Sequence, residues 1–267
     1  MNNDQLEHYK VPPLDIAVRL VGIGPPLIMF HGAEGDHRIY DNLQDALGSS
    51  VTAVSFDQRD CGRTEYTGLA QPYTLKDVAY DAVRLMDVLG YRKAHVLGNS
   101  IGGILAQLMA CHWPERVDRL VLGLTWPADE RLPDLNPEGL AKRAEYSAMG
   151  EAGLRPMAEL MSSADYVSAH PEILKELAEL SSGQEAEARE RRMAALSVPS
   201  LADPGSIPHK TLVIGGEDDQ MVPVDVTRQL ASKIPLSEFK VLKGAGHLAA
   251  RQYPGELASM IADFLNA

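Results

Sequence analysis

The chain has only two cysteines, Cys61 and Cys111, among its 267 residues. Two thiols so far apart provide neither a disulfide framework nor the spacing of a metal site, so we expect no bound metal and a reducing compartment. No apolar run approaches the length of a membrane span, and the amino-terminal stretch lacks the basic and apolar regions of a secretory signal. These absences predict a cytoplasmic protein with no membrane partner.

Basic residues are also in deficit. The 25 lysines and arginines stand against 37 aspartates and glutamates, which leaves a net charge of −12. Such an acidic surface argues against nucleic acid and anionic membranes as partners. Hydrophobic residues make up 45% of the chain and charged residues 23%, an ordinary globular composition at a length that can bury a substantial core. A homo-oligomer stays open.

Short apolar runs alternate with helical patterns through most of the chain. Strands are predicted at 16–21, 27–30, 51–56, 94–97, 120–124, 211–214 and 239–242. Helices are predicted at 39–47, 75–89, 224–234 and 255–265, and another helix follows the strand at 94–97. This alternation predicts an α/β fold with a mostly parallel, twisted sheet and helices on both faces.

The alternation stops after Trp126-Pro127. Residues 128–208 contain helical segments at 137–149, 153–162, 171–182 and 184–196, with no clear strand between them. An interruption of roughly eighty residues is far longer than an ordinary connection. We therefore predict a core of residues 1–127 and 209–267 and an inserted helical unit of residues 128–208, called the insertion below.

A tight turn lies in the stretch 94–103, which reads AHVLGNSIGG. The pattern predicts a strand, a sharp turn carrying Ser100, and a helix. Gly98 and Gly102 flank the serine because such a turn leaves no room for side chains and strains the serine backbone. The G-x-S-x-G pattern is typical of a nucleophile held at the positive end of a helix, whereas a serine that only caps the helix is the simpler alternative.

A serine nucleophile requires a base and an orienting carboxylate. His247 follows the predicted strand 239–242, and Asp219 follows the predicted strand 211–214. Because parallel strands end at one edge of a sheet, we expect both side chains to converge on Ser100. Glu217 and Asp218 are neighbouring alternatives for the carboxylate, and Asp129 is a more distant one.

An acyl intermediate also requires donors for its oxyanion. The backbone N–H of Ile101 follows the serine, and the loop HGAEG after the first buried strand offers the N–H of Ala33. Gly32 and Gly35 would let this loop approach the serine closely, and His31 is expected to order it.

Four motifs in this order, HGAEG, GNSIGG, GEDDQMVP and GAGH, resemble the α/β-hydrolase superfamily over essentially the whole chain. The resemblance implies the α/β-hydrolase fold with the insertion as a helical cap. It assigns Ser100 as nucleophile, His247 as base and Asp219 as acid. It implies a small-molecule substrate and no metal or organic cofactor.

Subfamily features point in different directions. Asn99 resembles the elbow of hydrolases that cleave C–C bonds in ring-fission products, whereas DQRDCGRT at 57–64 is similar to proline iminopeptidases and polyketide methylesterases. We predict a serine hydrolase acting on a small, largely apolar ester or lactone. A C–C bond hydrolase, a cofactor-free oxygenation or perhydrolysis, and a triad-bearing small-ligand receptor are the alternatives.

The sequence also predicts which residues surround the site. The expected pocket residues are Glu34, Trp126, Tyr146, Met149, Met157, Met161 and Tyr166. Arg189, Arg191 and Arg192 could bind a substrate carboxylate, but the interleaved glutamates predict a solvated helix face instead. Asp57, Arg59 and Asp60 are expected to form an ion-pair cluster beneath their loop.

Overall fold

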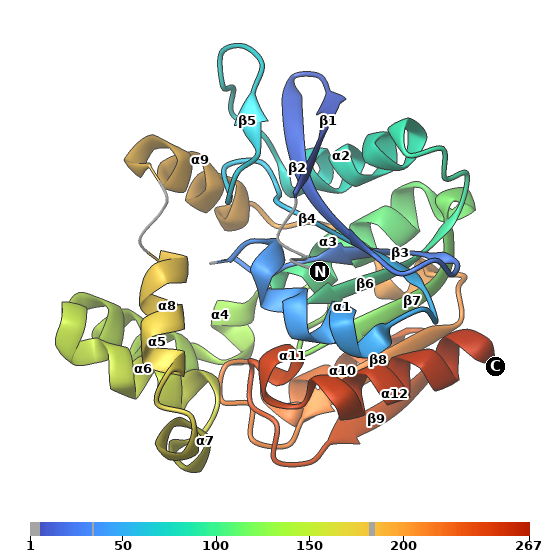
Figure 1. The fold of residues 1–267 in the computed structure, drawn as a ribbon. Coiled ribbons are helices and arrows are strands. Elements are labelled where there is room, and N and C mark those ends of the chain that lie inside the picture. The colour runs from blue at the N-terminus through green and yellow to red at the C-terminus, as the bar shows by residue number, and fades with distance from the viewer. Residues whose placement is uncertain (1–5, 34, 182–184) are drawn as a thin grey trace.

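The computed structural model describes residues 6–33, 35–181 and 185–267 (Figure 1). Within these ranges nine strands form one sheet in the order β1-β2-β4-β3-β6-β7-β8-β9, with β5 paired to β2. The strands are β1 Glu7–Val11, β2 Leu14–Val21, β3 Pro26–Phe30, β4 Thr52–Phe56, β5 Glu65–Tyr66, β6 Ala94–Asn99, β7 Val117–Gly123, β8 Thr211–Gly216 and β9 Ser237–Leu242.

The sheet is mostly parallel, which confirms the predicted fold class. Six neighbouring strands of the sheet, β4-β3-β6-β7-β8-β9, pair in parallel, whereas β2 is antiparallel to β1, β4 and β5. Parallel pairing brings the carboxyl ends of β3, β4, β6, β8 and β9 to the same edge. The loops that carry the predicted site residues all begin at this edge.

Helices cover both faces of the sheet (Figure 1). One apolar cluster joins the sheet to α2 Leu75–Val88, α3 Ile101–His112 and α10 Val224–Lys233. The other joins it to α1 Asp41–Leu47, α11 Ala249–Gln252 and α12 Pro254–Asn266. Helix α2 begins with a capping box between Thr74 and Asp77, which satisfies the free N–H groups of its first turn.

Helices fill the chain between β7 and β8. They are α4 Leu132–Leu135, α5 Pro137–Ala148, α6 Leu154–Met161, α7 Ala164–Ala169, α8 Ile173–Ser181 and α9 Ala186–Ser197. Short 3-10 helices occur at His37–Tyr40, Pro114–Arg116, Gly150–Gly153 and Pro204–Ser206. Helix α6 packs against α5, α7 and α8, whereas α9 lies apart from them, on the side of β5 (Figure 1). None of the described helices combines the length and the apolar character needed to cross a bilayer.

Candidate active site

Ser100 occupies the turn between β6 and α3 with φ 55° and ψ −127°. A positive φ is strained for any residue except glycine, so the predicted strain at this serine is present. A Cβ atom added to Gly98 would lie 2.1 Å from the carbonyl oxygen of Gly102, and one added to Gly102 would lie 2.0 Å from the carbonyl oxygen of Phe30. Glycine at both positions is therefore a steric requirement of the turn.

His247 and Asp219 lie side by side at the carboxyl ends of β9 and β8. Nδ1 of His247 is 2.8 Å from Oδ2 of Asp219, and Oδ1 of the same carboxylate accepts hydrogen bonds from the backbone N–H groups of Met221 and Val222. Asp219 is buried, so both of its oxygens have fixed partners in a dry environment. This arrangement directs the other ring nitrogen of His247 away from the carboxylate.

The alternative carboxylates are engaged elsewhere. Glu217 accepts a hydrogen bond from the N–H of Gly244, and Asp218 is exposed. Asp129 pairs with Lys233 at 2.8 Å. Of the carboxylates considered, Asp219 is the one that lies against His247.

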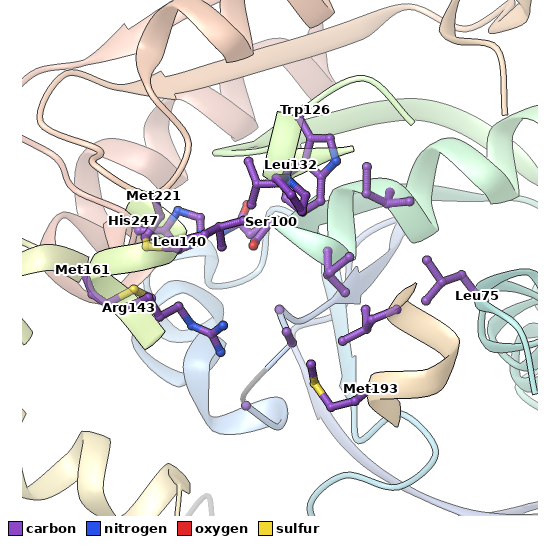
Figure 2. Close-up of a pocket in the computed structure, with 18 of the residues that line it drawn as sticks. Leu75, Ser100, Trp126, Leu132, Leu140, Arg143, Met161, Met193, Met221 and His247 are labelled. Atoms are coloured by element: carbon purple, nitrogen blue, oxygen red, sulfur yellow. The ribbon is translucent and has the colours of Figure 1, made fainter. Parts of the chain in front are cut away.

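A cavity of about 500 Å³ opens above this edge of the sheet, and both Ser100 and His247 line it (Figure 2). Ala33 and Ile101, which carry the expected oxyanion donors, line it as well. Its walls are mainly apolar, and it is large enough for a small organic molecule. Apolar residues on the wall include Leu132, Leu140, Met157, Met161, Trp126 and Met221.

The predicted pocket residues divide into two groups. Trp126, Met157 and Met161 line the cavity, whereas Tyr146, Met149 and Tyr166 are not among the described residues that do so. Met149 lies at the end of α5 with its side chain exposed, and Tyr166 stacks on the ring of His170 instead. Tyr146, on α5, is half-buried away from the cavity. Glu34 lies outside the described residues.

Three charged residues that line the cavity were not predicted, namely Glu130, Arg131 and Arg143. Arg143 on α5 lines the cavity together with Met161 and Ser100 (Figure 2). Leu140, three residues earlier, lines the same wall, as expected for neighbours on one helix face. The i, i+3 pairing of Leu140 and Arg143 is the sequence signal that could have indicated an inward-facing cation.

The prediction of a solvated face for the arginines of α9 is wrong at two of its three positions. Arg191 pairs with Asp60 at 2.6 Å. Arg192 is only 5% exposed and donates hydrogen bonds to the carbonyl oxygens of Ala33 and Gly32 and to the side chain of Gln58. The glutamates interleaved with these arginines indicate a helix exposed on all sides. One edge of α9, which carries Arg191 and Arg192, nevertheless faces the core.

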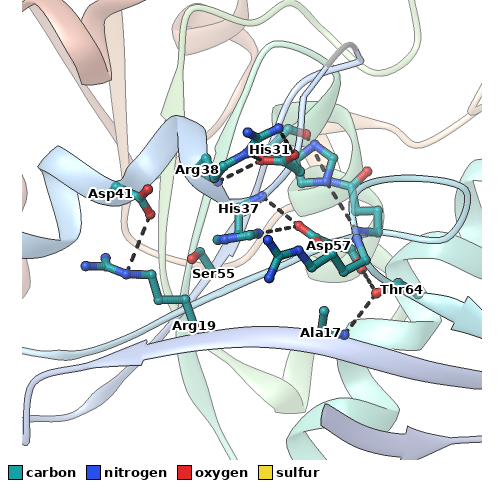
Figure 3. Close-up of polar contacts among 12 residues, drawn as sticks. Ala17, Arg19, His31, His37, Arg38, Asp41, Ser55, Asp57 and Thr64 are labelled. Atoms are coloured by element: carbon teal, nitrogen blue, oxygen red, sulfur yellow. Dashed lines mark hydrogen bonds and ion pairs between the residues drawn. The ribbon is translucent and has the colours of Figure 1, made fainter. Parts of the chain in front are cut away.

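The expected cluster of Asp57, Arg59 and Asp60 does not form as predicted, since each side chain has a different main partner. Arg59 makes a two-pronged ion pair with Asp81, both contacts at 2.7 Å, and Asp60 pairs with Arg191. Asp57 instead accepts hydrogen bonds from the backbone N–H groups of His37 and Arg63 and from the ring of His37 (Figure 3). These contacts fix the loop that follows β4.

Among the described residues, one group has the composition of a metal site, namely Asp36, His37 and Asp57, whose ligand atoms lie within 4.8 Å of one another. Asp36, however, is held by Arg38, and Asp57 is held by His37. Burial acts to lower the pKa of His37, but the hydrogen bond and charge of Asp57 outweigh it and raise that pKa. The group is best described as an ion-pair network.

His31 begins the loop after β3 and is fully buried. Its Nδ1 lies 2.8 Å from the carbonyl oxygen of Gly32, and its Nε2 accepts a hydrogen bond from the N–H of Gln58 (Figure 3). Because a carbonyl can only accept, the proton of the neutral ring resides on Nδ1. Burial, together with the positive charge of Arg192, lowers the pKa of His31 to about 4.

Comparisons with known proteins agree with the fold described above. A family model described as the alpha/beta hydrolase fold matches residues 25–250. The 2-hydroxymuconate semialdehyde hydrolase of Pseudomonas sp. strain CF600 is 30% identical, covering 91% of this chain and 88% of its own length. The proposed carbamate hydrolase RutD of Caulobacter segnis is 27% identical, covering 83% of this chain and 84% of its own.

Solved structures show the same architecture. The enol-lactonase of Burkholderia xenovorans superposes with a TM-score of 0.83 at 21% identity, covering 98% of this chain and 100% of that one. A hydrolase of Pseudomonas aeruginosa superposes with a TM-score of 0.82 at 24% identity, and both chains are covered completely. At these identities the likeness shows the fold alone.

Proposed function

The chain belongs to the α/β-hydrolase fold family and is a hydrolase, and from this premise we propose that it cleaves a small, largely apolar carboxylic ester or lactone through Ser100. One observation carries the proposal. Ser100, whose backbone is strained, lines the same cavity as His247, which is paired with Asp219. A serine, a base and a buried carboxylate around an apolar cavity are the groups that acyl transfer requires.

The chemistry then proceeds in two halves. Oγ of Ser100 attacks the acyl carbon while His247 accepts the proton of the serine hydroxyl. Asp219 orients the histidine ring and stabilises the imidazolium. The N–H groups of Ala33 and Ile101 stabilise the oxyanion, each worth about 3 kcal/mol in the transition state. His247 returns the proton to the departing alkoxide, and the alcohol leaves. His247 then takes a proton from a water molecule, which attacks the acyl-enzyme, and it passes this proton to Oγ of Ser100 as the acid is released.

The insertion supplies the far wall of the cavity in this proposal. Met157 and Met161 on α6 and Leu140 on α5 face the cavity from residues 128–208, opposite the edge of the sheet. This placement supports the division into a core of residues 1–127 and 209–267 and a cap of residues 128–208. Methionine side chains adapt to different apolar shapes, which suits an acyl group of moderate size.

A second candidate function is favoured by Arg143. A guanidinium within an apolar cavity is suited to holding a carboxylate. The relative at 30% identity is named a 2-hydroxymuconate semialdehyde hydrolase, a name that denotes a carboxylated substrate, and Asn99 resembles the elbow of C–C bond hydrolases. Cleavage of a C–C bond in a carboxylated ring-fission product is therefore the alternative reaction at the same Ser100.

Substitution of Ser100 by alanine tests the proposal. We expect S100A to lose at least about 10⁴-fold in kcat toward the best substrate from a panel of aryl esters, lactones and ring-fission products. S232A is the control, because Ser232 lies on the exposed surface of α10 and bonds only to its own helix. Turnover by S100A at the wild-type rate would contradict the assignment. Ligand binding without turnover by the wild type would indicate a receptor instead.

A further inference from the structure

Arg192 connects α9 of the insertion to the loop after β3, across 159 positions of sequence. Its Nε donates to the carbonyl oxygen of Ala33 at 2.8 Å, and its Nη2 donates to the carbonyl oxygen of Gly32 and to Oε1 of Gln58, both at 3.1 Å. The side chain is almost fully buried. A buried arginine is costly unless its donors are satisfied, and here backbone carbonyls satisfy it.

The carbonyl of Gly32 shares a peptide unit with the N–H of Ala33. In a trans peptide these two groups point in opposite directions, so fixing one fixes the other. The Gly32 oxygen accepts from both Arg192 and Nδ1 of His31. Neither of these donors is among the described residues that line the cavity, whereas Ala33 is. The oxygen is therefore held on the side away from the cavity, and the N–H of Ala33 is directed toward it.

This peptide also lies next to the nucleophile. A Cβ atom added to Gly32 would lie 3.7 Å from Cβ of Ser100. The loop backbone therefore passes close to the serine, which is where a donor to an oxygen on the attacked carbon must lie. Because glycine tolerates a wide range of backbone angles, the Gly32–Ala33 peptide needs contacts from elsewhere in the chain to keep one orientation.

We propose that Arg192 is a positioning residue for the oxyanion hole, which it maintains by holding the Gly32–Ala33 peptide with its N–H toward the cavity. The inference rests on the proposed function of Ser100. Without the guanidinium, rotation of this peptide presents the Gly32 carbonyl oxygen to the developing negative charge, which opposes the transition state. Because Arg192 belongs to α9, the orientation of the donor depends on the seating of the insertion.

A matched pair of substitutions on α9 tests the proposal. R192M removes the anchor of the peptide, whereas R191M removes the neighbouring ion pair to Asp60, which also joins α9 to the core but does not touch the loop. We expect R192M to lower kcat about 100-fold, as for loss of one oxyanion donor, with a change in KM below about threefold. R191M should stay within about threefold of wild type in both constants.

A short alkylboronic acid, which forms a negatively charged tetrahedral adduct with a serine, gives a readout other than turnover. We expect its inhibition constant to rise about 100-fold in R192M and to stay unchanged in R191M. If R192M does not fold, R192K keeps the charge but loses the planar fork that reaches two carbonyls, and kcat should still fall more than about tenfold.

Equal losses of kcat in R192M and R191M, or a change in KM without a change in kcat, would overturn the inference and identify Arg192 as a structural contact. The S100A result is independent. If S100A is inactive and R192M matches R191M, only the role of Arg192 fails. If S100A is active, the proposed function itself fails.

Discussion

At the scale of single residues, Arg143 offers a test between the two candidate substrates. We expect R143M to raise KM for a carboxylated ring-fission product about tenfold or more, because a charge-assisted contact to a carboxylate contributes about 1.5–3 kcal/mol. KM for a neutral aryl ester should change little or fall, since the substitution makes the cavity more apolar. Steady-state kinetics with both substrates on one preparation measures the difference.

The adjacent residue Lys142 provides the control for this substitution. Its ammonium pairs with Glu138 on the exposed side of α5 at 2.9 Å, so K142M removes the same charge from the helix without altering the cavity. An equal change in KM for the charged and the neutral substrate in R143M would show that Arg143 shapes the cavity but does not bind the substrate carboxylate.

The catalytic candidates were predictable because their positions follow from local rules. Ser100 needs glycines around it, and Asp219 and His247 each follow a buried strand, so the parallel sheet brings them to one edge. Arg143 and Arg192 were not predictable in the same way. Their directions depend on how the helices of the insertion sit on the core, and a helix with charges on several sides does not reveal which one faces inward.

At the scale of elements, the turn between β6 and α3 depends on glycine. G98A places a methyl group 2.1 Å from a backbone oxygen of α3, so α3 must move relative to β6. We expect a loss of about 3 kcal/mol in the free energy of unfolding and, through displacement of Ser100, a fall in kcat of about 100-fold. Urea titration and steady-state kinetics measure the two effects.

G255A is the matched control for G98A. Gly255 lies in the first turn of α12, is exposed, and has nothing within 4 Å of an added Cβ atom. Alanine should stabilise this helix by about 0.5–1 kcal/mol and leave kcat unchanged. If G98A retained wild-type stability and kcat, the lack of space for a Cβ atom would not be the reason for glycine at position 98.

Most elements were predictable to within a few residues, because the buried strands are continuous apolar runs. The elements that sequence analysis missed are short or polar. Strand β1 is a five-residue edge strand with mostly exposed residues, and β5 has only two residues. Helices α4 and α11 have four residues each, and α7 has six. Tertiary pairing, which no local pattern records, forms these elements.

At the scale of the whole molecule, polar contacts tie the insertion to the core at several places, among them the pair of Asp129 with Lys233 and contacts made by α8 and α9. Glu176 on α8 pairs with Arg251 on α11, and on α9 Arg191 pairs with Asp60 while Arg192 reaches the loop after β3. The walls of the cavity come from both parts, so its shape depends on these contacts. The proposed function thus assigns substrate selection to the insertion and placement of the nucleophile to the edge of the sheet.

Burial of a neutral His31 makes the stability of the whole fold depend on pH. Its pKa is about 4 in the folded protein, because of burial and the nearby charge of Arg192, against 6.5 for an ordinary histidine. Between pH 6.5 and 4 the unfolded chain therefore binds a proton that the folded protein does not. The contribution of His31 is fully present above pH 6.5 and is lost as the pH falls, with a slope of up to about 1.4 kcal/mol per pH unit.

Urea unfolding between pH 4 and 7.5 tests this dependence with H31N, whose neutral amide can still donate to the carbonyl of Gly32. Burial also lowers the pKa values of His95 and His209, which add a slope of the same sign, so the informative quantity is the difference between variant and wild type. We expect H31N to be less stable at pH 7 and to have a shallower slope below pH 6.5. H170Q, at an exposed histidine of the insertion, should keep the wild-type slope. Parallel curves for H31N and wild type would mean that His31 has the same pKa in the folded and unfolded chain, and the lowered pKa assigned to it beside Arg192 would be wrong.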